Sequence, residues 1–245
     1  MKNIFSISLI LCFAFQQNLY SQETIIKKNN KKSKSVIISS AMIVYGIIAV
    51  NDKHLIAINE DIHESVIPSD LSRQQHIDNY LQFTPAALTL GLNAVGVKGK
   101  HGFLGASIIY GMSNIFLNAF TIPTKQISHE LRPNGLGYSS FPSGHTAEAF
   151  ASAELMRMEF NDKSIWYGVA GYSMACATGY LRMYNNKHWF SDVLAGAAVG
   201  ILSTRLSEWI YTKAEPLLFK NKASHTLLMP YYKDNTFGLG LNYHF

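Results

Sequence analysis

The sequence predicts an all-α fold, a six-helix bundle followed by a C-terminal β-hairpin. Apolar residues make up 48% of the 245-residue chain and charged residues only 15%, a balance that excludes intrinsic disorder and favours a membrane protein or a compact exported protein. Apolar stretches of helical length alternate with short polar breaks along most of the chain. Only the last residues change to the period of two that is typical of a strand.

Six segments carry the helical pattern. They are Ser35–Val50, Leu81–Val97, Gly102–Ile122, Thr146–Phe160, Ile165–Leu181 and His188–Tyr211. The stretch Asn51–Tyr80 is polar and contains a turn signal at Pro68, so we interpret it as a connection. The stretch Pro123–Gly144 contains proline and glycine residues and is interpreted as a loop.

The tail has a strand pattern. Small or polar residues alternate there with Phe237, Leu239, Leu241, Tyr243 and Phe245. Leu227–Tyr232 precedes this segment across a short polar turn, and its Pro230 is tolerated on an edge strand. We interpret the tail as a hairpin that packs on the bundle.

The first 22 residues have the features of a secretory signal peptide. Lys2 supplies the positive start, Ile4–Phe15 the apolar run, and residues 20–22 a processing region. Because Gln22 is not a small residue, an uncleaved anchor is the alternative. Both interpretations predict export to the cell envelope.

The formal charge of +5 suits acidic partners. Much of this excess lies in one run, which holds Lys27, Lys28, Lys31, Lys32 and Lys34. No aromatic residue is interleaved with these lysines to stack on bases. We therefore expect a solvated basic segment and no nucleic-acid binding.

Residues that suit phosphate chemistry gather between positions 125 and 192. They form three blocks: Lys125 with Arg132 and Pro133, then Pro142-Ser143-Gly144-His145, then Arg182 with His188 and Asp192. Arginine donates planar, bidentate hydrogen bonds to phosphate oxygens, and lysine adds a point charge. Ser143 and Gly144 precede a helix start predicted near Thr146, whose backbone N–H groups also favour an anion. The three cations and this turn are therefore candidate phosphate ligands.

His188 and Asp192 are four residues apart on one predicted helix, hence on one face. The carboxylate can accept the proton of one ring nitrogen and leave the other with a free lone pair. His188 is therefore a candidate nucleophile. His145 comes from a different block and is a candidate general acid, because the ordinary histidine pKa of about 6.5 suits proton donation.

The three blocks resemble the signature of the type 2 phosphatidic acid phosphatase and vanadium haloperoxidase superfamily, which is Lys-x6-Arg-Pro, Pro-Ser-Gly-His and Ser-Arg-x5-His-x3-Asp. The departure is Leu181, where the family usually has serine, and it removes one hydroxyl donor near the phosphate. The resemblance covers Leu81–Tyr211 and implies a helical bundle of the type 2 phosphatidic acid phosphatase kind.

The resemblance also implies a metal-independent phosphatase that needs no cofactor. Its phosphate ligands here would be Lys125, Arg132, Ser143, Gly144 and Arg182. His188 would attack phosphorus to form a phosphohistidine, Asp192 would orient His188, and His145 would protonate the leaving oxygen. Some relatives hold vanadate in the same pocket and oxidise halides, so a haloperoxidase is an alternative. No metal site is expected, because the remaining histidines form no ligand pattern.

We therefore expect four regions. They are a signal peptide (1–22), a basic segment with the first helix and a polar connection (23–80), a phosphatase catalytic bundle (81–215) and a β-hairpin tail (216–245). His129 and Glu130, which lie between Lys125 and Arg132, are interpreted as loop residues.

Topology determines the expected location. If the first three predicted helices all crossed a membrane after a cleaved signal, Lys125 would reach the cytoplasm, so at least one is expected not to span. The fourth, Thr146–Phe160, carries Glu148, Glu154, Arg157 and Glu159, and we expect it to face water. We predict a periplasm-facing domain associated with the inner membrane, with a soluble periplasmic protein as the alternative.

The expected substrate is a phosphorylated envelope lipid, such as phosphatidic acid, phosphatidylglycerol phosphate, an isoprenyl diphosphate or a lipid A phosphate. One alternative is a soluble non-specific acid phosphatase that acts on small phosphomonoesters. Another is a non-catalytic envelope binding protein, against which the intact His188 and Asp192 pair argues. The sequence indicates no oligomeric state.

Overall fold

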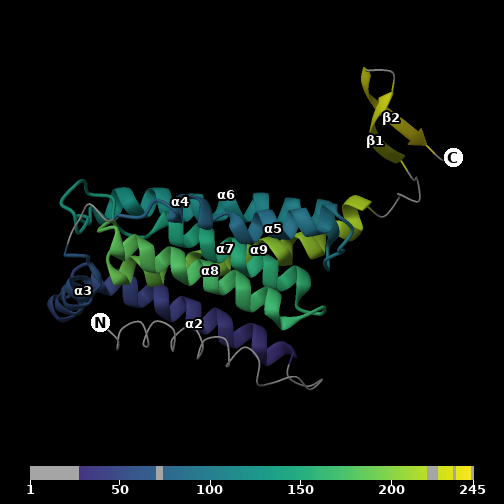
Figure 1. The fold of residues 1–245 in the computed structure, drawn as a ribbon. Coiled ribbons are helices and arrows are strands. Elements are labelled where there is room, and N and C mark those ends of the chain that lie inside the picture. Colours follow the sequence, from purple (N-terminus) through teal and green to yellow (C-terminus); the bar gives the residue numbers. More distant parts are fainter. Residues whose placement is uncertain (1–27, 70–73, 220–225, 234–235, 244–245) are drawn as a thin grey trace. The chain divides into compact units, whose positions relative to one another are not determined.

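The structure is a computed structural model that describes residues 28–69, 74–219, 226–233 and 236–243. The predicted signal peptide lies outside the described residues. The chain divides into two units, Met1–Glu208 and Trp209–Phe245. Figure 1 shows the described part of the first unit as packed helices.

The described chain contains eight helices. They are α2 (Lys28–Ala49), α3 (Lys53–Val66), α4 (Asp78–Leu81), α5 (Thr84–Ala94), α6 (Gly102–Ser128), α7 (Gly144–Phe160), α8 (Ile165–Tyr184) and α9 (Phe190–Phe219). The all-α prediction is confirmed for the described part of the first unit, but the predicted number of helices is too low. The two additional helices, α3 and α4, lie in the polar stretch that we interpreted as a connection.

Helix α3 forms within this polar stretch because it has a good cap and a short apolar side. The side chain of Asp52 caps its start by accepting hydrogen bonds from the backbone N of His54 (3.0 Å) and Leu55 (3.1 Å). Ile62 and Val66, one turn apart, pack into a buried cluster with α8 and α9. A few apolar positions are enough to dock a helix that is polar elsewhere.

Helix α9 continues from the first unit into the second. In the second unit, strands β1 (Thr226–Lys233) and β2 (Thr236–Tyr243) pair in antiparallel fashion. Thr226 lies opposite Tyr243, and Lys233 lies opposite Thr236. These strands occupy the segment in which the sequence has a period of two.

Small residues let α7 and α9 approach each other closely. Ala147 and Ala151 of α7 are fully buried. A Cβ added at Gly200 of α9 would lie 2.1 Å from the carbonyl oxygen of Ala147, and one at Gly196 would lie 2.5 Å from that of Ser143. Because Ser143 is the residue that precedes α7, this contact also fixes the Pro-Ser-Gly-His turn against α9.

Replacing Gly200 with alanine is expected to destabilise the protein by about 1–3 kcal/mol, because the new methyl group overlaps Ala147 and forces the helices apart. Gly111→Ala is the matched control in α6. A Cβ at Gly111 meets nothing within 4 Å, so alanine should be neutral or slightly stabilising through helix propensity. Thermal unfolding in detergent measures both variants, and equal melting temperatures would contradict the close contact.

The three glutamates of α7 do not face water, so the expectation of a water-facing helix was wrong. Glu148, Glu154 and Glu159 are 6%, 0% and 3% exposed. Glu154 accepts hydrogen bonds from Nε of Arg157 (2.7 Å) and Nε of Arg205 (2.8 Å). Burial by itself would raise the pKa of Glu154, but the two arginines lower it to about 2. Partners inside the bundle replace water here, which the pattern of one helix does not reveal.

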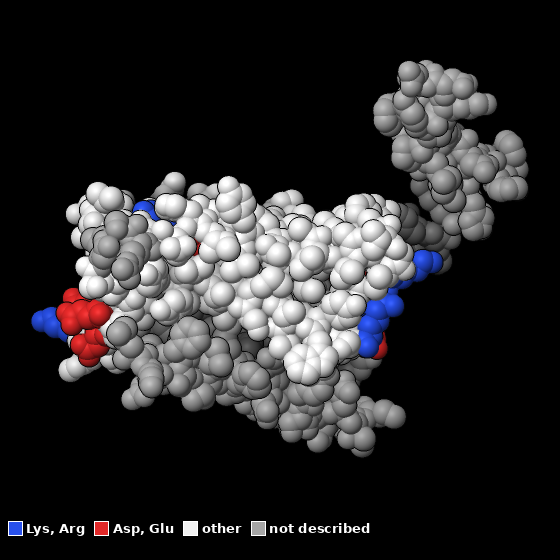
Figure 2. All heavy atoms as spheres, viewed as in Figure 1, with Lys and Arg blue, Asp and Glu red and all other residues white. Residues whose placement is uncertain are grey.

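Two helices of the described chain are long and apolar enough to cross a membrane, Gly102–Ser128 and Phe190–Pro216. Val36–Ala49 and Lys53–Val66 would form a third span if this pair, bent by 98°, acted as one. Large apolar side chains of α6 are exposed, namely Phe103, Leu104, Ile115, Phe120, Ile122 and Ile127. Charged side chains are sparse on the face drawn in Figure 2 and gather towards its two ends. This distribution fits contact with lipid.

Candidate active site

Lys125 lies in the last turn of α6 and binds the loop that follows. Its Nζ donates hydrogen bonds to the carbonyl oxygens of Ser139 (2.8 Å) and Ser140 (3.2 Å). Helix α6 ends at Ser128, and the next residue, His129, adopts a left-handed conformation with φ 47°. The loop between α6 and α7 therefore folds back over the end of α6.

Tight turns position Arg132 in this loop. Its backbone N donates to the carbonyl oxygen of Gly137 (3.1 Å), and the N of Gly135 donates to that of Arg132 (2.9 Å). Both glycines have positive φ, 98° and 70°, which glycine adopts without strain. The Arg132 side chain is half-buried, and its Nε makes no hydrogen bond to any described residue. This guanidinium group is therefore available to an anion.

Ser143 caps α7, which begins at Gly144 rather than near Thr146. The Ser143 hydroxyl accepts a hydrogen bond from the backbone N of Thr146 (3.4 Å) and lies 2.8 Å from its Oγ1. The backbone N of Ser143 donates to the carbonyl oxygen of Asp192 (3.1 Å). A Cβ at Gly144 would meet nothing within 4 Å. The backbone of this first turn is therefore open to a ligand.

Arg182 lies in the last turn of α8 and is held by a residue of α4. Its Nη1 donates to Oδ2 of Asp78 over 2.6 Å, and both side chains are buried. Nε of Arg182 and Oδ1 of Asp78 make no hydrogen bond to any described residue. Arg182 thus has one N–H group fixed by Asp78 and at least one other, on Nε, that can donate to a ligand.

His188 and Asp192 are together at the start of α9. His188 Nδ1 lies 3.3 Å from Asp192 Oδ2, and the side chains are 3% and 0% exposed. Because the carboxylate accepts, Nδ1 carries the proton and Nε2 keeps its lone pair. Ser140 Oγ (2.5 Å) and Trp189 N (2.8 Å) donate to the same oxygen. Helix α9 begins at Phe190, so His188 precedes the helix that was predicted to contain it.

His145, the second residue of α7, points its ring at α4. Its Nε2 lies 3.0 Å from Oδ1 of Asn79. An amide oxygen only accepts, so Nε2 carries the proton and Nδ1 is the nitrogen left for other chemistry. The charges of Lys125, Arg132 and Arg182 all act on this imidazole. The second histidine therefore shares one site with the three cations.

Glu130, which we interpreted as a loop residue, interacts with Asp192 and Ser140 of the site. Its carboxyl is half-buried, and its Oε2 makes no hydrogen bond to any described residue. Burial, together with the negative charge of Asp192, raises the pKa of Glu130 well above its ordinary value, which favours the protonated carboxyl. Its carbonyl oxygen accepts from the backbone N of Ser140 (3.0 Å), the residue whose hydroxyl binds Asp192.

The structure thus brings the residues of all three sequence blocks into one site. A family model described as the PAP2 superfamily matches residues 115–216, which include every one of these blocks. This segment belongs to the PAP2 superfamily.

The chain is also similar to an individual protein. It is 36% identical over 180 residues to a protein of Porphyromonas gingivalis named "Lipid A 1-phosphatase". The aligned part is 73% of this chain and 40% of the relative. The chain therefore spans about two fifths of the length of that relative.

Two solved structures are similar to the chain. The crystal structure of Aquifex aeolicus LpxE is 20% identical and covers 61% of this chain and 94% of its own, with a TM-score of 0.47. The first transmembrane PAP2 type phosphatidylglycerolphosphate phosphatase from Bacillus subtilis is 17% identical and covers 72% and 96%, with a TM-score of 0.49.

His145 and His188 both favour the neutral form. Burial lowers the pKa of His188 to about 4, although Asp192 opposes this shift. Burial and the charge of Arg182 lower the pKa of His145 to about 4. A neutral ring suits a nucleophile. A phosphate anion bound among the cations would raise the pKa of His145 again, because a nearby opposite charge favours the protonated form.

The low pKa of His188 predicts a pH-dependent stability. A histidine in the unfolded chain has a pKa of about 6.5. Between pH 6.5 and pH 4 the unfolded state therefore binds more protons at His188 than the folded state, and the free energy of unfolding falls as the pH falls. Relative to His188→Gln, the wild type should lose about 3 kcal/mol over this window. Denaturant unfolding in detergent at several pH values measures the difference. A constant difference would contradict the burial of a neutral imidazole.

Sequence reasoning missed part of the site. Ser140 lies between the first two blocks, and this position was a signal that we did not use. Glu130 lies inside the first block, where we interpreted it only as a loop residue. Asp78 and Asn79 lie far upstream, in the stretch interpreted as a connection, and no sequence signal marked them. Leu181, which replaces the usual serine, is half-buried. In the part of the chain that the structure describes, no group of three or more His, Cys, Asp or Glu residues is arranged to hold a metal ion.

Proposed function

We propose that this protein is a metal-independent phosphatase that removes phosphate from a phosphorylated envelope lipid through a phosphohistidine. The observation that carries this proposal is the site itself. Three cationic side chains, Lys125, Arg132 and Arg182, share it with the buried His188 and Asp192 pair. Such an arrangement holds a phosphate group next to a nucleophile with a free lone pair.

The chemistry would proceed in two displacements. Nε2 of His188 attacks phosphorus, the P–N bond forms, and the bond from phosphorus to the leaving oxygen breaks. His145 gives a proton to that oxygen. A water molecule then attacks the phosphohistidine, His145 takes its proton, and the P–N bond breaks to release inorganic phosphate. The cations and the open turn at Gly144 stabilise the charge on the phosphate oxygens in both steps.

The position of the site supports a lipid substrate. Lys125 is in the last turn of α6 and Asp192 in the first turn of α9, the two helices that are long enough to span a membrane. If both helices span, the site lies at one membrane surface, where lipid phosphates lie. The relative named Lipid A 1-phosphatase favours a lipid A phosphate within this class.

We further infer that the catalytic bundle faces the periplasm from the inner membrane. The expected signal peptide at residues 1–22 supports this orientation. The hairpin tail then belongs to the same exported chain, and a soluble periplasmic enzyme is the competing arrangement.

Phosphate release by the purified protein tests the proposal. The assay uses detergent, no added metal, and a panel of lipid A 1-phosphate, phosphatidic acid, phosphatidylglycerol phosphate, an isoprenyl diphosphate and a small aryl phosphate. Release from a lipid supports the proposal. Release from the aryl ester alone would replace it with the soluble acid phosphatase. Halide oxidation with vanadate and peroxide, without phosphate release, would replace it with the haloperoxidase.

A further inference from the structure

Helix α4 carries two neighbouring polar residues that each hold a different part of the site. Asp78 Oδ2 accepts from Arg182 Nη1 over 2.6 Å, and Asn79 Oδ1 lies 3.0 Å from His145 Nε2. One of these partners is a candidate phosphate ligand and the other is the candidate general acid. The two partners come from different helices, α8 and α7.

The structure holds α4 firmly in this place. Upstream of it, the backbone N of Gln75 donates to Asn185 Oδ1 (2.9 Å), and Asn185 Nδ2 donates back to the carbonyl oxygen of Gln75 (2.6 Å). Asn185 is the C-cap residue that follows the end of α8 at Tyr184. Downstream, Nε2 of Gln82 donates to the carbonyl oxygen of Asn79 (2.9 Å). The segment before α4 is thus tied to the end of the helix that carries Arg182.

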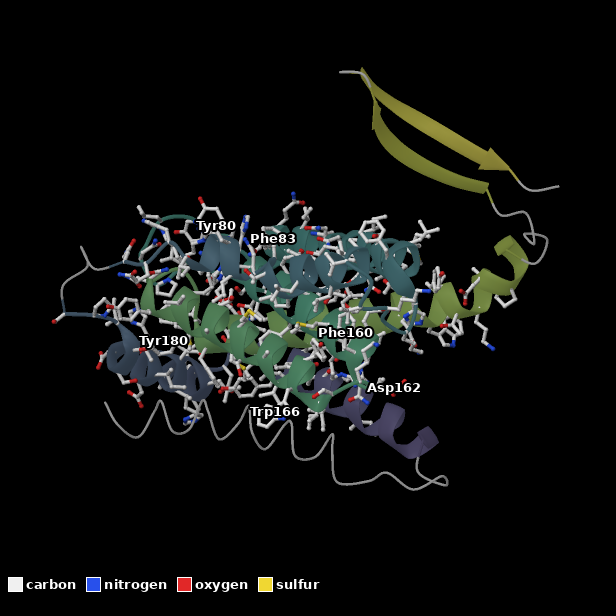
Figure 3. The ribbon with its side chains drawn as sticks, turned by 45° about the vertical axis from the view of Figure 1, so that its right-hand side comes forward. Tyr80, Phe83, Phe160, Asp162, Trp166 and Tyr180 are labelled. Carbon is white, nitrogen blue, oxygen red and sulfur yellow. The ribbon has the colours of Figure 1, made fainter. Side chains whose placement is uncertain are left out.

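The two sides of α4 differ. Asp78 is fully buried, whereas Tyr80, labelled in Figure 3, is 78% exposed. The buried Oδ1 of Asp78 and the buried Nε of Arg182 have no hydrogen-bond partner among the described residues. The Asp78 carboxylate binds one donor of Arg182 and leaves Nε of the same guanidinium group without a partner among the described residues. It therefore orients the guanidinium group and leaves a donor for a ligand.

We infer that Asp78 and Asn79 are positioning residues, Asp78 for the phosphate-binding Arg182 and Asn79 for the general acid His145. This inference rests on the proposed function. Asp78 holds Nη1 so that the remaining N–H groups of Arg182 meet the phosphate in a fixed orientation. Asn79 Oδ1 accepts a hydrogen bond from Nε2–H of His145, so that Nδ1 faces the leaving oxygen.

Equilibrium binding of inorganic phosphate tests the role of Asp78 without turnover. Asp78→Ala is expected to weaken phosphate binding about tenfold, because Arg182 loses its orientation. Asp78→Asn keeps an oxygen that accepts from Nη1 and should recover most of the affinity. Asp162→Asn is the matched control, because Asp162 is exposed beyond the far end of α7. Unchanged or tighter binding by Asp78→Ala would show that Asp78 acts only as a counter-charge and would overturn this assignment.

The role of Asn79 is tested by the pKa of His145, followed by NMR of labelled histidine and by the pH profile of kcat. The charged groups that act on this ring are Arg182, Asp78, Lys125 and Arg132. Asn79→Asp adds a negative charge beside Nε2 and should raise the pKa by about one unit or more, whereas Asn79→Ala should lower it. The alkaline limb of kcat should move in the same directions, with little change in KM.

Asn118→Ala is the control for the amide, because Asn118 is exposed and bonds only within α6 among the contacts described. Equal histidine pKa values in the two Asn79 variants, with both proteins folded, would overturn the assignment. The proposed function fails separately. If the wild type releases no phosphate from any substrate, the proposed phosphatase function is rejected. The phosphate-binding and NMR measurements still test the positions of Arg182 and His145.

Discussion

His188→Ala is expected to lower phosphate release from the lipid substrate by about 10⁴-fold or more, because no other group can take over the attack on phosphorus. Lys125, Arg132 and Arg182 remain in the variant, so substrate binding should change little. The loss therefore appears in kcat rather than in KM. Initial rates over a range of substrate concentrations measure both parameters.

The same variant separates nucleophilic from structural effects. Wild-type protein quenched during turnover of phosphorus-labelled substrate should carry an acid-labile label, as a phosphoramidate does, and His188→Ala should carry none. His54→Ala is the control, since His54 is an exposed histidine of α3. A variant at position 188 that keeps the label, or loses less than about tenfold in rate, would exclude His188 as the nucleophile.

His145→Ala is expected to show an effect that depends on the leaving group. With a lipid phosphate the group that leaves is the lipid oxygen, a poor leaving group that needs a proton, so the rate should fall by about 10²–10⁴-fold. With nitrophenyl phosphate the nitrophenolate leaves without protonation, so formation of the phosphoenzyme should fall by less than about tenfold. The ratio of the two rates, measured on the same protein preparation, isolates proton donation from any loss of folding.

The two steps of the reaction give a second test of His145. The same residue takes the proton of the attacking water, so with the nitrophenyl ester the variant should accumulate the phosphoenzyme that the wild type turns over. Equal losses with both substrates, and no accumulation, would assign His145 a binding role instead. Asn79→Ala should reproduce part of the leaving-group dependence, because it disturbs the same ring.

The spacing of neighbouring residues predicted most of the candidate catalytic and phosphate-binding groups. His188 and Asp192 are four residues apart, and their side chains meet as expected, with 3.3 Å between Nδ1 and Oδ2, although His188 precedes α9 by two residues. Ser143 and Gly144 were expected at a helix start, and they are there because the Ser143 hydroxyl accepts from the backbone N of Thr146 and caps the helix. These features depend on residues that are close in the sequence.

Features that depend on contacts between distant segments were missed or misjudged. Glu154 looked like a surface residue, yet it is buried because Arg205 reaches it from another helix. Helix α3 looked like a connection, yet it is a helix because Ile62 and Val66 find apolar partners on α8 and α9. A pattern in one segment does not state which partner the rest of the chain supplies.

The sequence by itself determined the all-α class, the three motif blocks and the chemical types that a phosphate site needs, because helical periodicity and capping act over a few residues. Only the tertiary structure decided that Asp78 and Asn79 hold Arg182 and His145, and that burial and the charge of Asp192 raise the pKa of Glu130. The physical reason is that burial and the charges of distant neighbours set the protonation and orientation of a side chain. Those neighbours are assembled only when the helices pack.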